Sequence, residues 1–273
     1  MRIGILASPD NRITDYYLGN QLIRNFDVPV VLIQSPAIRT RRGRWFKAAR
    51  RMISRGPTGT LLALRNRRYE QVRQREFSIY LSRYFDALGE YGGYDSGPEI
   101  IEVDDVHAAD SIRILKDCGV TLLFQNGAGI IRRSLIDFAE DGVLNVHHGY
   151  LPYIRGCHSI AWGLLENRME WIGVSVHLID EGIDTGPILK RKHLPVQPDG
   201  TYASLFCEAT VLGGQLLTEA VADLSEGDSK SIPHHGQGTY RPAMTKKQWE
   251  MLSDRRNRLS RPTLVREVCR RSC

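Results

Sequence analysis

The sequence predicts an α/β protein with a doubly wound, mostly parallel sheet. Short apolar segments alternate with amphipathic ones along the chain, and several of the apolar segments are hydrophobic at nearly every position, as buried parallel strands are. The composition agrees, because 42% of the 273 residues are hydrophobic and 25% are charged. Such values are typical of a globular chain and exclude a disordered one.

The predicted elements follow in order from these patterns. Strands are expected at residues 2–7, 28–33, 99–103, 120–124, 142–149 and 172–178. A helix is expected at residues 13–25, and a second one is expected to begin at Asp104-Asp105 and to end at Gly119. Apolar residues at helical spacing between Leu205 and Ala220 predict a long core helix. The segment after the first strand lacks a G-x-G-x-x-G motif, so we expect neither NAD nor FAD.

Composition and length exclude several classes of protein. The longest uninterrupted apolar stretch, Val28–Ile33, has six residues, far below the ~20 that cross a bilayer. The N-terminal apolar segment is too short for a signal peptide, so we expect a cytoplasmic protein without a membrane anchor. The five cysteines are scattered, and the paired histidines at 147–148 and 234–235 lack completing ligands. We therefore expect neither a disulfide framework nor a metal site.

The net charge of +6 is unevenly distributed along the chain. Between Arg39 and Arg75 there are 13 basic residues and one acid, a net charge of +12, so the remaining residues carry −6. Apolar residues at helical spacing, from Trp45 to Ile53 and again from Phe77 to Leu88, predict helices in this region. The segment fits either a solvated helical surface or a surface that binds phosphates of a substrate or a nucleic acid.

Three segments near the ends of predicted strands carry chemically useful groups. Residues 125–131 form a turn with two glycines, and the carboxyl ends of parallel strands commonly bind ligands. Asn145 and His147 lie two positions apart on one strand, so they share a face and could stabilise one oxyanion, although a structural pair fits the same pattern. Residues 180–187 form a loop with two glycines and three carboxylates, without the ligand spacing of an EF-hand.

Together these segments resemble a known family. The blocks LNVHHGYLPYIRG at residues 144–156, AW at 161–162 and GVSVHLIDEGIDTGPIL at 173–189 are similar to the signature of the 10-formyltetrahydrofolate-dependent formyltransferases. That family includes glycinamide ribonucleotide formyltransferase, methionyl-tRNA formyltransferase and the sugar N-formyltransferases. The resemblance is dense from residue 120 to residue 224, and it implies a Rossmann-like domain with 10-formyltetrahydrofolate as co-substrate.

The resemblance also assigns roles to individual residues. The family's catalytic residues fall on Asn145, His147 and Asp184: the first two would stabilise the oxyanion, and Asp184 would accept a proton and orient the imidazole. The folate would lie against Gln125, Asn126, Gly127, Gly129, Ile130, Ile131, Asp180, Glu181 and Gly182. Residues expected near the amine acceptor are Arg155, Gly156 and Tyr240, of which the first could also form a structural salt bridge and the last could also pack. The family often has Pro-Ser after the catalytic histidine, whereas this chain has His148-Gly149.

The resemblance and the charge together suggest the acceptor and the domain organisation. We expect a catalytic domain at residues 1–225, containing a basic helical insertion at about residues 36–98, and a short C-terminal extension at residues 226–273. The first choice of acceptor is a phosphorylated small-molecule amine, an amino sugar nucleotide, because guanidinium groups bind diphosphates well.

Three alternatives stay open. Methionyl-tRNA fits the same charge, but only 33 residues follow Tyr240, so we expect no C-terminal barrel of the kind found in methionyl-tRNA formyltransferases. The other two are hydrolysis of 10-formyltetrahydrofolate and a non-catalytic polyanion-binding module. The sequence leaves the oligomeric state open, a homodimer included.

Overall fold

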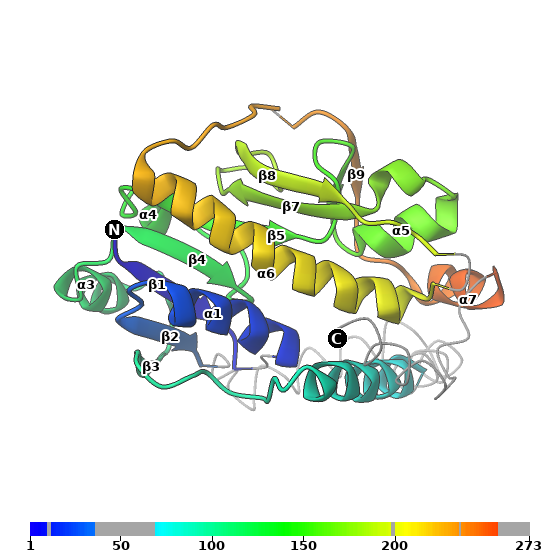
Figure 1. Cartoon of the computed structure of the whole chain (residues 1–273), viewed down its shortest axis with the longest axis horizontal. Coiled ribbons are helices and arrows are strands. Elements are labelled where there is room, and N and C mark those ends of the chain that lie inside the picture. Colours follow the sequence, from blue (N-terminus) through cyan, green and yellow to red (C-terminus); the bar gives the residue numbers. More distant parts are fainter. Residues whose placement is uncertain (10–11, 36–68, 198–199, 235, 256–273) are drawn as a thin grey trace, which may run out of the picture.

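The computed structural model describes residues 1–9, 12–35, 69–197, 200–234 and 236–255, and within them seven strands form one mixed sheet (Figure 1). The strands are β1 (Ile3–Ala7), β2 (Val30–Gln34), β3 (Glu99–Val103), β4 (Leu122–Asn126), β5 (Gly142–His147), β6 (Ile154–Gly156), β7 (Gly173–Leu178), β8 (Ile188–His193) and β9 (Thr239–Arg241). The helices are α1 (Ile13–Asn25), α3 (Ala109–Asp117), α4 (Arg133–Ile136), α5 (Ser159–Glu166), η1 (Met169–Trp171), α6 (Tyr202–Glu226) and α7 (Lys246–Arg255).

The sheet is doubly wound, as the sequence predicts. Its strand order is β3-β2-β1-β4-β5-β7-β8, and β6 pairs with β9 in a separate ribbon. The strands from β3 to β5 run parallel, whereas β7 and β8 are antiparallel to their neighbours. Because the chain starts in the middle of the sheet and winds outward in both directions, the strand order switches between β1 and β4. Ligands bind at the carboxyl edge beside such a switch point in open α/β sheets.

Side chains of the central strands alternate between two cores. In β4, Leu122 and Phe124 face a core shared with α1, α5 and α6, whereas Leu123 faces a smaller core that includes residues of α3 and α4. This alternation follows from the period of two in a strand. Both faces are therefore covered, which explains why these strands are apolar at nearly every position. In Figure 1, α1 and α6 cross the same face of the sheet.

Several predicted ends of strands and helices differ from the structure by a few residues, and two of these differences have a local cause. The helix expected from Asp104-Asp105 begins at Ala109, because the Asp105 side chain accepts a hydrogen bond from the backbone N–H of His107 (3.0 Å) and holds a turn ahead of the helix. Gln125 and Asn126, expected in a turn, continue β4, because they pair with the end of β1. The turn follows at Gly127 and Gly129, which both have positive φ.

Residues 69–87 form a helix that packs on α1 and α6. The predicted apolar series from Phe77 to Leu88 is confirmed: Phe77 stacks on Tyr202 with ring centroids 5.4 Å apart, and Phe85 contacts Tyr17 at 5.1 Å. Leu88 lies just beyond the helical residues. The preceding part of the predicted basic insertion, residues 36–68, lies outside the described residues.

The last elements of the described chain, from α6 onward, pack against the rest of the fold. Helix α6 has 25 residues and, among the described residues, is the one helix long and apolar enough to cross a membrane, but most of it is buried inside the protein as a core helix. Beyond it, β9 pairs in parallel with β6, and Trp249 of α7 is buried against Tyr202. Within the predicted C-terminal extension, β9 and α7 therefore pack against the body of the protein, β9 next to the motif at residues 144–156.

Candidate active site

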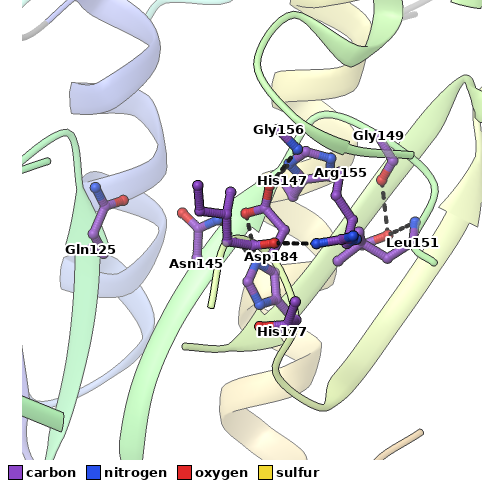
Figure 2. A network of polar contacts seen from close by, with 12 residues as sticks. Gln125, Asn145, His147, Gly149, Leu151, Arg155, Gly156, His177 and Asp184 are labelled. Atoms are coloured by element: carbon purple, nitrogen blue, oxygen red, sulfur yellow. Dashed lines mark hydrogen bonds and ion pairs between the residues drawn. The ribbon is translucent and has the colours of Figure 1, made fainter. Parts of the chain in front are cut away.

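A cleft of about 420 Å³ opens at the carboxyl edge of the sheet, beside the switch point. It is lined by the residues that follow β1, by the end of β4 and by the end of β5, and these contributions include Gln125, Asn145 and His147. The two β5 residues thus face one cleft, as their spacing predicts. Its volume lies in the usual range for small-molecule sites. Figure 2 shows the side chains gathered around Asp184.

His147 is buried and contacted on both ring nitrogens. Its Nδ1 lies 3.5 Å from Asp184 Oδ2. Its Nε2 lies 3.2 Å from the Ile154 carbonyl oxygen and 3.2 Å from Ser159 Oγ. The ring is therefore fixed in orientation, with Nδ1 toward the carboxylate.

The position of Asp184 is set by its backbone and by two neighbouring residues. Its φ of 51° lies in the left-handed region, where a non-glycine residue is uncommon and occurs mainly in tight turns and sites. The backbone N–H of Gly156 donates to Asp184 Oδ2 at 2.8 Å. Arg155 donates to the carbonyl oxygens of Ile183 (3.1 Å) and Gln237 (3.2 Å). Gly156 and Arg155, expected near the acceptor, therefore brace the loop that carries Asp184 (Figure 2).

His177 is a site residue that sequence reasoning did not single out. It lies on β7 directly opposite Asn145 of β5 in the antiparallel register. Its Nδ1 is 2.8 Å from the Leu178 carbonyl oxygen and therefore carries a proton. Its Nε2 lies 3.1 Å from Asn145 Nδ2 and 3.5 Å from Asp184 Oδ1. Nε2 of His177 accepts one N–H of the Asn145 amide, which leaves the second N–H to donate to an oxyanion in the cleft.

The charges of the cluster follow from burial and from these contacts. Burial lowers the pKa of His147, and the interaction with the neighbouring His177 acts in the same direction, while Asp184 opposes both. Burial alone would raise the pKa of Asp184, but His147, His177 and the Gly156 N–H outweigh it and hold that pKa well below its ordinary value. At neutral pH the site therefore combines an ionised carboxylate with an imidazole that is readily neutral.

Of the residues predicted to hold the folate, one group lines the cleft and the others lie in the turn that follows β4 and in the loop that carries Asp184. Gln125, Asn126 and Gly127 line the cleft directly. The side chain of Ile130 is 84% exposed in the same turn, next to Gly129 and Ile131. In the acidic loop, Asp180 accepts from the Gly182 N–H at 3.0 Å, and Glu181 pairs with Arg133 at 3.2 Å. The side chains of Asp180 and Glu181 thus stabilise the loop itself, and the backbone groups of the loop stay available to a ligand.

One part of the cleft wall is cationic and aromatic. Arg12, Arg73 and His158 line it together with Tyr202 and Phe206. The ring of His158 accepts a hydrogen bond from the backbone N–H of Met244 at Nδ1 (3.1 Å), so the neutral ring presents an N–H at Nε2. Burial and the two nearby arginines lower the pKa of His158 and keep it neutral. Tyr240, by contrast, is 46% exposed on β9 and is not among the described residues that line the cleft.

Comparisons with known proteins agree with this arrangement. Residues 122–221 match the family model described as formyl transferase. The match covers just over a third of the chain. It contains Asn145, His147, His177 and Asp184, and it confirms the family resemblance of the sequence.

The individual relatives either match this chain over only part of their length or share only its fold. The methionyl-tRNA formyltransferase of Myxococcus xanthus is 37% identical over 109 residues, which are 40% of this chain and 35% of that protein. The chain thus spans about a third of the length of this curated relative. A sugar N-formyltransferase from Shewanella sp. FDAARGOS_354 is 16% identical with a TM-score of 0.54, covering 98% of this chain and 86% of that chain.

A second solved structure adds ligands to the comparison. A sugar 3N-formyl transferase solved in the presence of dTDP and 5-N-formyltetrahydrofolate is 17% identical, with a TM-score of 0.51. The match covers 89% of this chain and 69% of that chain. At these identities the two solved structures show that this chain has the formyl transferase fold.

Proposed function

We propose that the protein is an N-formyltransferase that moves a formyl group from 10-formyltetrahydrofolate to the primary amine of a phosphorylated small molecule, an amino sugar nucleotide being the first choice. One observation carries this proposal: Asn145 and His147 face the same cleft, and Asp184 lies 3.5 Å from the His147 ring. The match of residues 122–221 to the formyl transferase family supports it.

The cluster supplies the groups that formyl transfer needs. An amine attacks the formyl carbon, a C–N bond forms, and the carbonyl oxygen becomes an oxyanion. The second N–H of Asn145 can donate to that oxygen, and the positive charge of protonated His147 beside the cleft stabilises it, while the ionised Asp184 takes up the proton released by the attacking nitrogen. The bond to the folate nitrogen then breaks, and that nitrogen takes a proton, which gives a formamide and tetrahydrofolate.

The cationic part of the cleft wall supports a phosphorylated acceptor. Arg12, Arg73 and the Nε2–H of His158 are donors without acceptor capacity in their ordinary charge states, which suits phosphate oxygens. The rings of Tyr202 and Phe206 lie on the same wall, where a sugar or base could pack. An acceptor whose amine reaches His147 would therefore place an anionic group at this part of the wall.

Aminoacyl-tRNA is a second candidate acceptor. It is favoured by the name of the curated relative from Myxococcus xanthus and by the +12 charge between Arg39 and Arg75. Most of that basic segment precedes the described residue 69, whereas the cleft itself offers contacts for a small anion.

The proposal is tested by incubating the protein with 10-formyltetrahydrofolate and a panel of amines, including amino sugar nucleotides and methionyl-tRNA, while tetrahydrofolate release is recorded. We expect amine-dependent release, with turnover reduced about 10²–10³-fold in Asn145→Ala and His147→Ala and about 10²–10⁴-fold in Asp184→Asn. Asparagine is the suitable replacement because it tolerates the left-handed backbone of position 184.

Each other outcome points to a different function. Release without any amine would indicate hydrolysis. No release, together with nucleic acid binding that weakens steeply with salt, would indicate a polyanion-binding module. A folded variant that keeps wild-type turnover would remove the corresponding residue from the catalytic cluster.

A further inference from the structure

The space next to the His147 ring is shaped by Gly149. A Cβ atom added at Gly149 would lie 2.5 Å from His147 Nε2 and 2.7 Å from Ser159 Cβ, both closer than real contacts allow. Gly149 is not among the described glycines with positive φ, so its backbone does not require glycine. The absence of a side chain at this position therefore serves the packing of Ser159 against His147.

Ser159 contacts the catalytic ring directly. It is the first residue of α5, it is only 2% exposed, and its Oγ lies 3.2 Å from His147 Nε2. The other partner of Nε2, the Ile154 carbonyl oxygen, can only accept a hydrogen bond. A hydroxyl can both donate and accept, so it is the one partner of Nε2 in this structure that suits the nitrogen with or without its proton.

We propose that Ser159 is a positioning residue for His147, whose hydroxyl holds Nε2 in both protonation states and so keeps Nδ1 directed at Asp184. When Nε2 carries a proton, the Ile154 carbonyl and the Ser159 oxygen both accept it. When Nε2 carries no proton, the Ser159 hydroxyl rotates and donates to it. This hydrogen bond offsets the repulsion between the lone pair of Nε2 and the Ile154 carbonyl oxygen. Gly149 leaves the room that this contact needs.

Among the charged and titratable groups around the ring, Asp184 favours the same tautomer. Asp184 faces Nδ1 from the loop after β7, and its negative charge favours a proton on that nitrogen. His177 of β7 and the adjacent His148 are the nearby imidazoles, and they interact with His147 through charge. In neutral His147 we therefore expect the proton on Nδ1, with the Ser159 hydroxyl donating to Nε2.

The test reads the tautomer of His147 in the resting protein by NMR of ¹⁵N-labelled histidine, with the His147→Gln variant used for assignment. In Ser159→Ala, Nε2 faces only a carbonyl, so we expect the ratio of the Nε2–H to the Nδ1–H tautomer to rise about fivefold, the equivalent of one ordinary hydrogen bond. Ser159→Cys keeps the space filled with a weaker donor and is expected to shift the ratio in the same direction. Ser111→Ala, at a serine equally buried at 2%, is the control and should leave the ratio unchanged.

The kinetic consequence rests on the proposed formyl transfer and is measured separately. With the best amine of the panel, Ser159→Ala should lower kcat about tenfold and leave KM unchanged, because the ring and not the substrate has lost a contact. An unchanged tautomer ratio in Ser159→Ala would overturn the proposal, as would a Ser159→Cys protein identical to wild type, which would indicate packing alone. If wild-type protein transfers no formyl group, the proposed function fails, while the NMR result still decides the role of Ser159.

Discussion

The side chains of the proposed catalytic cluster are held by partners from distant parts of the chain. Asn145 is oriented by His177, and Asp184 by the backbone N–H of Gly156. The strand period predicted that Asn145 and His147 share one cleft, whereas the catalytic roles of these two residues and of Asp184 stay a prediction. The role of His177 could not be predicted, because it depends on the antiparallel register that places it opposite Asn145, and no local pattern specifies that register.

His148 gives a prediction about acid stability. Its ring packs edge-on against Phe206 with centroids 4.6 Å apart, and burial lowers its pKa to about 3, with His147 and Arg12 acting in the same direction. An unfolded histidine titrates near pH 6.5, so between these values the unfolded chain binds more protons than the folded one. The free energy of unfolding should therefore fall as the pH drops from about 6.5, by about 2–3 kcal/mol at pH 4 from this residue alone.

The measurement is urea unfolding at pH 7 and at pH 4. We expect His148→Gln to lose less stability than wild type over that interval. His193→Gln, at an exposed histidine, provides the control and should follow the wild-type curve. Equal acid sensitivity of wild type and His148→Gln would contradict the prediction.

At the scale of elements, the sequence patterns predicted which segments form strands and helices more accurately than they predicted where those segments begin and end. Helix α1 begins and ends where it was predicted, at Ile13 and Asn25, and β3 also matches its predicted residues. The start of α3 was wrong because a side-chain contact of Asp105 stabilises a turn ahead of it, and such a contact competes with helix formation without changing the apolar period. The continuation of β4 to Asn126 depends on pairing with β1, which is a tertiary effect.

The helix at residues 69–87 gives a prediction that separates stability from substrate binding. Phe77 lines the cleft and contacts Tyr202 and Phe206, whereas Phe85 is fully buried against Tyr17 and does not line the cleft. Replacement of either residue by alanine should destabilise the protein by about 3–5 kcal/mol. Only Phe77→Ala should also raise the KM for the acceptor, because only Phe77 borders its proposed binding site.

Chemical denaturation and steady-state kinetics on the two variants check this. Both variants are compared at a temperature at which each is folded, so that unfolding of a variant is not mistaken for weaker binding of the acceptor. A KM raised equally by Phe85→Ala would mean that the helix affects the acceptor through stability and not through the wall of the cleft.

At the scale of the whole molecule, the charge distribution bears on the acceptor rather than on the chemistry. Asn145, His147 and Asp184 all lie outside the +12 segment, in the part of the chain that carries −6. Within the described residues, Arg73 is the basic residue of that segment that lines the cleft, and its guanidinium lies 4.1 Å from the ring centroid of Trp249 and pairs with Glu70 at 2.8 Å. The fold class could be predicted because it depends on periodicity, whereas the division at residue 225 stays a prediction.

Salt dependence distinguishes the two acceptor classes. A small phosphorylated amine held by two guanidinium groups releases few counterions, so its KM should rise no more than about tenfold between 50 and 200 mM salt. A tRNA whose phosphates contact 6–10 basic residues should lose about 10³–10⁵ in affinity over the same range. We expect the weak dependence for the preferred acceptor, because the cleft beside His147 presents Arg12 and Arg73 and is closed by aromatic rings. A steep dependence, abolished when arginines between Arg39 and Arg75 are replaced by glutamine, would assign the basic segment to tRNA and overturn the small-molecule choice.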